Sequence, residues 1–378
     1  MKKTYSLLLL LSAIFGFAQI PAGYYSSATG SGYALKTQLK SIISAGHIDQ
    51  GYSALWNLYT QSAYRDNYYE NDGSLLDLYT EKPNGVDTYN FTSTSQQCGS
   101  YSGEGDCYNR EHLVPQSYFD NYLVDPMKND PFHVVPSDGK VNGDRGNLAF
   151  GIVASGSYLS SNGSKRGPNT VNAFSNYSST VFEPIDAFKG DVARSFFYFA
   201  TRYEDLMDDF YNTANGATCQ AKNMFDGSIN KVFSDDFILI LIKWHLQDPV
   251  SPKEIAQNNA NYAFQGNRNP FIDTPSYVCN IWSTQCATVN ALLSSESFLA
   301  DNAVSIYPNP TNTNEVEIFT TETITKLSLV NINGQVIKDI QNPIFYQNIY
   351  KLNNLPQGFY FLQISAENGS LTKKIIVN

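Results

Sequence analysis

The chain has little positive charge, few histidines and no long apolar run beyond its N-terminus. Its 378 residues include 25 Lys and Arg against 35 Asp and Glu, which gives a formal net charge of −10. This is the wrong sign for a protein that binds nucleic acid through a basic surface, because such binding depends on cations that neutralise phosphates. The acidity fits solubility outside the cell. Any action on nucleic acid must therefore depend on a local site, with a metal ion supplying positive charge.

The apolar run at the N-terminus is short. Two lysines precede an apolar stretch from Leu7 to Phe15, and small residues follow as far as Ala18. This pattern is typical of a secretory signal peptide, so we expect residues 1–18 to be removed before Gln19. The run is shorter than the roughly 20 residues that cross a membrane, and no later segment is long and apolar enough, so we expect no membrane span.

Cysteine is scarce, and no two cysteines have CxxC spacing. The five are Cys98, Cys107, Cys219, Cys279 and Cys286. The absence of CxxC argues against a zinc knuckle. In an oxidising compartment, Cys98–Cys107 and Cys279–Cys286 could each close a short loop. Cys219 is left over, either as a free thiol or as a competitor for one of those bridges.

The length suggests two folded units, and 42% hydrophobic with 16% charged residues fits a globular protein with a real core. Apolar spacing predicts helices at 36–44, 52–59, 188–204 and 234–248. In the last of these, Ser234 is a candidate N-cap, and Pro249 requires the helix to end near Asp248. A strand is predicted at 74–80, and the polar, Gly- and Ser-rich segment 92–109 is predicted to be a loop.

Near residue 291 the helical patterns stop and short alternating runs begin. They lie at 304–307, 316–319, 327–332, 335–338, 359–364 and 373–377. Asn333-Gly334 between two of these runs is a strong hairpin signal. We therefore predict a small all-β sandwich at 303–378, joined by a linker at 287–302 to a helix-rich unit at 19–286.

The chain has only four histidines, so each one is informative. His112 follows Arg110 and Glu111, and an imidazole beside a carboxylate can act as a general base next to a metal ligand. A second polar stretch, residues 130–147, contains His133, Asn142 and Arg145. Its Asn, Asp and Gly residues also suit a simple turn, and each stretch is a weak signal by itself.

Together these stretches resemble the bacterial endonuclease I family, a branch of the ββα-metal (His-Me finger) nucleases. The resemblance covers roughly residues 30–282. It depends on several spaced motifs in the order found in the family: CYNREH (107–112), VNGDRGN (141–147), ARSFFYF (193–199), WHLQDPVS (244–251) and GNRNPFID (266–273). The resemblance implies an α+β fold with a helix-rich ββα-metal nuclease domain.

The resemblance also implies a role for each matching position. His112 matches the general base, and Glu111 and Asn142 match the two protein ligands of one Mg²⁺, for which Ca²⁺ or Mn²⁺ are alternatives. The products would carry 5′-phosphate ends. Arg110 and Arg145 are candidates for phosphate contacts, and the alternative for both is an arginine paired with a neighbouring carboxylate.

Some positions depart from the family pattern or pose a geometric problem. Phe132 stands where many members have the first histidine of a pair whose second is His133, and Thr274 stands where a histidine often follows. Neighbours on a regular strand face opposite sides, so Glu111 and His112 can share one site only if the strand ends or kinks there.

Two further residues suit structural roles better than catalytic ones, and a third is a candidate for the site. His245 and Arg194 lie on apolar helices and suit a packed histidine and a structural ion pair, respectively. Arg268 is a candidate for supporting the site.

The C-terminal unit is similar to the sorting domains of the type IX secretion system. The similarity depends on YPNP (307–310), LVNINGQ (329–335), LPQGFYF (355–361) and KKIIV (373–377). It implies a partnership with that secretion machinery and a secreted or cell-surface location. The alternative is a carbohydrate- or surface-binding β-sandwich.

The expected function is a secreted, metal-dependent endonuclease that acts, as a monomer, on DNA or RNA. A catalytically inactive surface-binding protein is the main alternative, and the presence of Glu111, His112 and Asn142 together argues against it. A metallopeptidase is disfavoured because the chain has no His-Glu-x-x-His motif.

Overall fold

The computed structural model describes residues 20–119, 125–154, 156, 158–214, 219–332, 335–366 and 369–378. The predicted signal peptide, residues 1–18, therefore lies outside the described residues. The chain divides into two compact units, up to Cys286 (the first unit) and from Ala287 (the second unit). Among the described residues, no helix is both long and apolar enough to cross a lipid bilayer.

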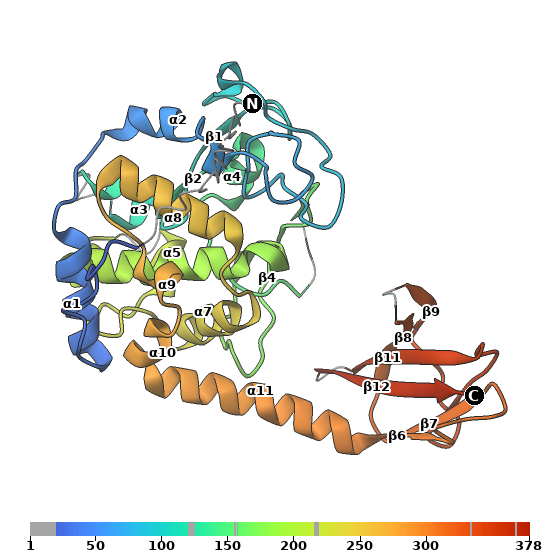
Figure 1. Ribbon diagram of the computed structural model, residues 1–378. Helices are drawn as coiled ribbons and strands as arrows, with labels where there is room; N and C mark the ends of the chain where they lie inside the picture. The colour runs from blue at the N-terminus through green and yellow to red at the C-terminus, as the bar shows by residue number, and fades with distance from the viewer. Residues whose placement is uncertain are drawn as a thin grey trace, which may run out of the picture. The chain divides into compact units, whose positions relative to one another are not determined.

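Helices are the main regular elements of the first unit (Figure 1). They are α1 Gly32–Ser44, α2 Leu55–Leu58, α3 Gln116–Phe119, α4 Gly139–Arg145, α5 Lys189–Arg202, α6 Met207–Thr213, α7 Asp235–Gln247, α8 Pro252–Gln265, α9 Pro270–Asp273 and α10 Tyr277–Ile281. The four predicted helices are present, although the one at 52–59 begins with a 3₁₀ turn. Helix α5 lies at the centre, packed against α1, α7 and α9.

The sequence explains where the two best-predicted helices lie. Helix α5 is apolar on most of its surface, and ten of its residues are buried, which places it inside the core rather than on the surface. Helix α7 begins at its predicted N-cap, where the Ser234 hydroxyl accepts a hydrogen bond from the Phe237 amide at 3.4 Å. It ends at Gln247, just before Pro249, as predicted.

The strand predicted at 74–80 is wrong. Leu75 makes an isolated bridge with Arg65, and the chain then turns. The cause is Asp77, whose carboxylate accepts bonds from the Tyr79 amide at 2.7 Å and the Thr80 hydroxyl at 2.7 Å. Such a turn competes with extended backbone. It leaves the Tyr79 side chain fully buried.

Five short strands lie in the described part of the first unit. They are β1 Tyr108–His112, β2 Val134–Asp138, β3 Tyr158–Leu159, β4 Lys165–Pro168 and β5 Thr180–Glu183. Strands β1 and β2 form one antiparallel pair, and β3, β4 and β5 form a second sheet in that order. The loop predicted at 92–109 ends at residue 107, because β1 begins at Tyr108. Both predicted disulfides are present, and Cys219 is free and buried.

The segment predicted to be a linker, 287–302, is helical. It belongs to α11 Ser283–Ala303, so the prediction that helical patterns stop near residue 291 is wrong. Residues 287–302 contain no glycine or proline and include several alanines and leucines, which favours a helix over an extended linker.

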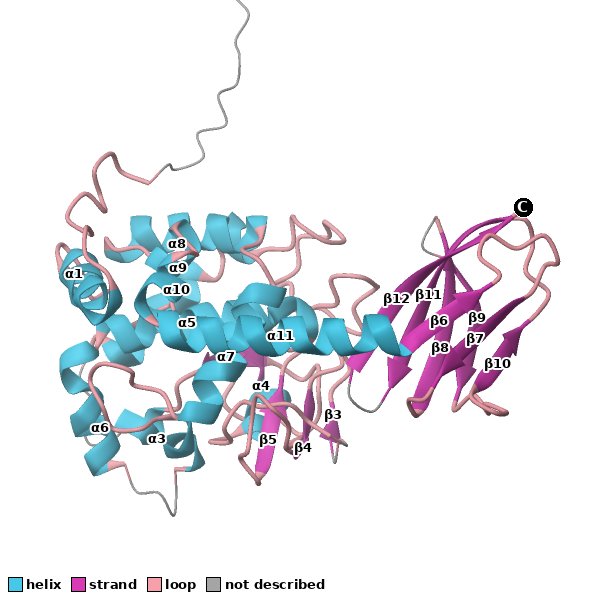
Figure 2. Ribbon diagram, turned by 90° about the horizontal axis from the view of Figure 1, so that it is seen from below, coloured by secondary structure: helices cyan, strands magenta, loops and turns pink. Residues whose placement is uncertain are grey.

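The second unit is a β-sandwich, as predicted (Figure 2). Its strands are β6 Val304–Tyr307, β7 Val316–Thr320, β8 Ile324–Asn331, β9 Val336–Gln341, β10 Ile349–Leu352, β11 Gly358–Ala366 and β12 Gly369–Val377. They form two antiparallel sheets, ordered β10-β7-β6 and β12-β11-β8-β9, and both sheets contribute to one apolar core. Strands β8 and β9 pair as the hairpin signal predicts, and the turn at 333–334 lies outside the described residues. Strand β10 was not predicted.

Candidate active site

Two short strands and a helix build the candidate site. Strand β1 runs antiparallel to β2, with Glu111 opposite Val135 and His112 opposite Val134. Strand β2 ends at Asp138, whose carboxylate caps α4 by accepting a bond from the Val141 amide at 3.0 Å. The chain therefore passes from strand directly into helix, which brings α4 beside the end of β1.

The five residues expected from the sequence to act as base, metal ligands or phosphate contacts line one cleft. Arg110, Glu111 and His112 come from β1, and Asn142 and Arg145 come from α4. The cleft has a volume of about 240 Å³. Strand β1 ends at His112, which resolves the geometric problem, because adjacent residues at a strand end need not alternate between faces. Glu111 and His112 are only 2% and 8% exposed, respectively.

Glu111 is held by two donors on one of its oxygens. Its Oε1 accepts bonds from the Tyr79 hydroxyl at 2.9 Å and from Arg145 Nη1 at 3.0 Å. Burial raises the pKa of Glu111, while the Arg145 guanidinium and the Tyr79 hydroxyl favour the charged form. Because both bonds fall on Oε1, the Oε2 atom is available as a ligand. Tyr79 carries no sequence signal for this role, since its placement depends on the Asp77 turn.

Asn142 is oriented by a neighbouring amide. Its Nδ2 donates to Asn109 Oδ1 at 2.7 Å, and the Ser137 hydroxyl lies 3.5 Å from the same oxygen. With Nδ2 engaged as a donor, Asn142 Oδ1 is left as an acceptor. An amide oxygen and a carboxylate oxygen in one cleft are the hard ligands that suit Mg²⁺. Asn109 stands within the sequence motif, but nothing in the sequence indicated that it would position Asn142.

His112 is buried in its neutral form. Its Nε2 lies 3.1 Å from the Lys128 carbonyl oxygen, which can only accept, so Nε2 carries the hydrogen and Nδ1 carries the lone pair. Burial, together with the nearby His133, lowers the pKa of His112 to about 3. The Gln116 side-chain amide lies 3.4 Å from Nδ1 and 3.1 Å from Nε2. Gln116 also lines the cleft and was not predicted.

Arg145 is directed towards protein groups. It is 1% exposed. Besides Glu111, its Nη1 donates to the His112 carbonyl at 2.8 Å and its Nη2 donates to the Leu113 carbonyl at 2.7 Å. This geometry favours the alternative of a carboxylate-paired arginine over a phosphate contact.

Arg110 is arranged differently from Arg145. Its guanidinium lies 3.4 Å from the ring centre of Tyr52 and 4.1 Å from that of Trp56, and its Nη1 donates to the Tyr52 carbonyl at 2.8 Å. Among the described residues it has no carboxylate partner, so no described carboxylate neutralises its charge.

The remaining residues weighed in the sequence lie outside the cleft. Arg194 forms the expected buried ion pair, with Nη2 2.8 Å from Glu254 Oε2. Arg268 does not support the cleft, because its guanidinium pairs with Asp273. His245 and His133 are buried and bonded to the Pro275 and Met127 carbonyls, and Phe132 packs on Tyr198. Thr274 follows the last residue of α9.

The antiparallel strand pair, the helix that follows it and the cleft they share define the protein as a nuclease of the ββα type. The chain belongs to the endonuclease I family, whose family model, described as Endonuclease I, matches residues 31–276. A second family model, described as a secretion system C-terminal sorting domain, matches residues 305–378. The protein is therefore a nuclease that is secreted or displayed at the cell surface through a type IX sorting domain.

Two bacterial relatives agree with this placement. An extracellular ribonuclease of Bacillus amyloliquefaciens is 34% identical over 263 residues, which cover 68% of this chain and 78% of the relative. An extracellular ribonuclease of Bacillus subtilis is 33% identical over 264 residues, with the same shares covered. A solved structure of PorZ, a surface component of the type IX secretion system of Porphyromonas gingivalis, matches 20% of this chain and 12% of its own at 16% identity and a TM-score of 0.18, which carries no weight.

Proposed function

We propose that the protein is a Mg²⁺-dependent endonuclease that hydrolyses phosphodiester bonds and leaves 5′-phosphate ends. The observation that carries this proposal is the convergence of Glu111, His112 and Asn142 on one cleft at the junction of β1 and α4. DNA and RNA are both proposed substrates. The two Bacillus relatives, which are named as ribonucleases, support the inclusion of RNA.

His112 is the proposed general base. The Lys128 carbonyl holds the Nε2 hydrogen, so Nδ1 is the atom that takes a proton from the attacking water. The low pKa keeps His112 neutral and able to accept this proton, and a bound anionic phosphate would raise its basicity. The Gln116 side chain contacts the His112 ring, so it would have to move away from Nδ1 to make room for that water.

Glu111 and Asn142 are the proposed metal ligands. Their Oε2 and Oδ1 atoms remain available because the partner atoms of each group are fixed by Arg145, Tyr79 and Asn109. A bound Mg²⁺ supplies charge stabilisation for the phosphorane and for the leaving 3′ oxygen. Arg110, stacked on two rings and without a carboxylate partner among the described residues, is the proposed phosphate contact.

The organisation of the chain follows from these assignments. We propose residues 19–286 as the catalytic unit and residues 303–378 as the sorting unit, with the protein acting as a monomer. The residues that line the cleft all belong to the first unit.

The test is a cleavage assay on plasmid DNA and on a long RNA, with Mg²⁺ and with EDTA. Purified protein should cleave with Mg²⁺ only, and ligation of the products should report 5′-phosphates. His112→Ala should lower the rate by on the order of 10²–10⁴, the usual share of general acid–base catalysis. His47→Ala, a histidine outside the cleft, is the matched control and should keep its activity. Full activity of His112→Ala would remove His112 from the mechanism.

A further inference from the structure

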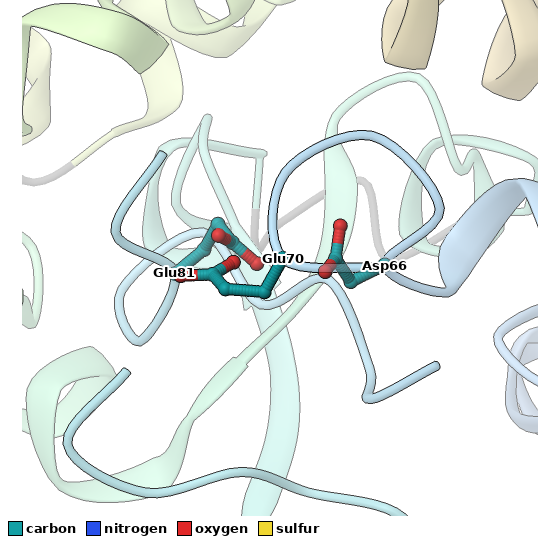
Figure 3. A group of neighbouring side chains, drawn as sticks. All are labelled: Asp66, Glu70 and Glu81. Carbon is teal, nitrogen blue, oxygen red and sulfur yellow. The ribbon is translucent and has the colours of Figure 1, made fainter. Parts of the chain in front are cut away.

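A group of carboxylates lies outside the catalytic cleft, where the loop after Asp66 meets the segment that ends at Glu81. Asp66, Glu70 and Glu81 each offer one oxygen, and these oxygens all lie within 4.8 Å of one another. Figure 3 shows the three side chains gathered together. Neither the catalytic proposal nor the sequence motifs use any of them.

Glu81 is the feature that points to a ligand. Its side chain is buried, with the residue 1% exposed, and neither carboxylate oxygen has a hydrogen-bond partner. Buried carboxylates in proteins are ordinarily paired, hydrogen-bonded or bound to a metal. Burial, together with the negative charges of Asp87, Glu70 and Asp66, raises the pKa of Glu81 to about 9. The neighbouring side chains that raise this pKa are therefore acidic themselves.

Asp66 is fixed in place before any ligand arrives. Its Oδ1 accepts bonds from the Tyr68 amide at 3.0 Å and the Tyr69 amide at 2.9 Å, and its Oδ2 accepts one from the Asp72 amide at 3.3 Å. These bonds hold the aspartate in a tight loop. Glu70 lies in the same loop and is exposed, so it can close over the other two carboxylates from the solvent side.

No lysine or arginine in the described part of the chain pairs with Asp66, Glu70 or Glu81. The nearest lysine in sequence, Lys82, instead donates its amine to the Thr88 hydroxyl. The protein thus provides three converging carboxylates, two of them buried, without a cation of its own.

We propose that Asp66, Glu70 and Glu81 bind a calcium ion. Ca²⁺ takes six to eight oxygens in flexible geometry, which suits carboxylates from two irregular segments, whereas Mg²⁺ demands an octahedron and usually keeps several waters. Oxygens separated by up to 4.8 Å fit around one ion whose bonds are about 2.4 Å long. The exposed Glu70 leaves room for water to complete the shell.

The site has a structural consequence for the catalytic cleft. Glu81 lies two residues after Tyr79, whose hydroxyl holds Glu111 Oε1 at 2.9 Å. A cation that joins Glu81 to the Asp66 loop would therefore fix the segment that positions Tyr79. Its role is to stabilise, and it takes no part in phosphodiester cleavage.

The experiment measures the melting temperature of the full-length protein with EDTA and then with Ca²⁺. At about 5 mM Ca²⁺, an affinity of roughly 10⁻⁴–10⁻³ M, usual for extracellular modules, predicts a rise of roughly 2–8 °C. Glu81→Gln and Glu70→Gln should lose this rise, while Asp209→Asn, an exposed aspartate elsewhere, should keep it. In EDTA, Glu81→Gln should melt at or above the wild-type temperature, because it removes the cost of burying that acid among other carboxylates.

Two further measurements separate this site from the catalytic one. The Asn142→Ala variant, which changes the catalytic cleft, should keep the Ca²⁺-dependent rise in melting temperature. Tb³⁺ luminescence, excited through the adjacent Tyr68 and Tyr69, should be lost in Glu70→Gln, whose exposed position spares the fold. The proposal is overturned if Ca²⁺ does not change the melting temperature of the wild type. It is also overturned if the Ca²⁺-dependent rise in melting temperature disappears in Asn142→Ala and persists in Glu81→Gln. Neither outcome depends on nuclease activity.

Discussion

Replacing Arg145 with methionine should lower the free energy of unfolding of the first unit by about 3–5 kcal/mol, the usual cost of removing one partner from a buried ion pair. Arg145 and Glu111 form such a buried ion pair, because their side chains are only 1% and 2% exposed, respectively. The substitution would also leave the His112 and Leu113 carbonyls without their donors at 2.8 and 2.7 Å. Methionine keeps most of the side-chain volume, so the loss reports on charge and hydrogen bonds rather than on a cavity.

The assay is urea unfolding followed by circular dichroism, together with cleavage kinetics under conditions where the variant stays folded. The loss corresponds to a fall in melting temperature of roughly 6–20 °C. Adding Glu111→Gln to Arg145→Met should recover part of the stability, because no unpaired charge then remains buried. Arg110→Met is the control, and it should change stability little while raising KM. A surface ion pair contributes at most about 1 kcal/mol to the free energy of unfolding. If Arg145→Met lowers that free energy by less than this and raises KM, then Arg145 contacts the substrate and our interpretation is wrong.

Three further predictions follow from the site and the fold. Glu111→Ala should raise the Mg²⁺ concentration needed for half-maximal cleavage more than Asn142→Ala does, since it removes the only anionic ligand, and unchanged half-saturation in both would refute the ligand set. Burial lowers the pKa of His245 to about 4, so its contribution to stability is present above pH 6.5 and is lost as pH falls. Between pH 7 and 5 the free energy of unfolding should therefore fall by roughly 2 kcal/mol more in the wild type than in His245→Gln. An equal fall in the two proteins would contradict this. Deleting 304–378 should preserve cleavage in vitro but keep nuclease activity out of the culture supernatant of the native host, and loss of activity by a folded truncated protein would contradict the division into two units.

Local patterns in the sequence predicted the parts of the fold that depend on local physics. The cap at Ser234, the proline after α7 and the alternation of β8 and β11 each act over a few residues, and each predicted the element found. The prediction of a strand at 74–80 failed because a run of apolar residues suits a buried turn as well as it suits a strand. The Asp77 side chain turned the backbone, which no pattern of hydrophobicity records.

The residues of the candidate site could be predicted from the sequence, but the hydrogen bonds that orient them could not. The motifs placed Glu111, His112 and Asn142 together, and the structure brings all three to one cleft. Asn109, Tyr79 and the Lys128 carbonyl orient those three groups through contacts that depend on tertiary packing. The inward direction of Arg145 was undecidable for the same reason, because an arginine beside acidic residues can face either substrate or protein.

The burial of α5 has a consequence for how relatives of this protein are recognised. The motif at 193–199 lies in that helix, and its residues are almost all buried. The motifs at 244–251 and 266–273 likewise contribute core residues such as Trp244 and Asn267, and none of the three lines the cleft. A search that scores these motifs therefore detects the scaffold, and it would accept a chain that had lost its chemistry. Under the proposed mechanism, positions 111, 112 and 142 are the ones that would distinguish a working member from a protein that has kept the fold for another purpose.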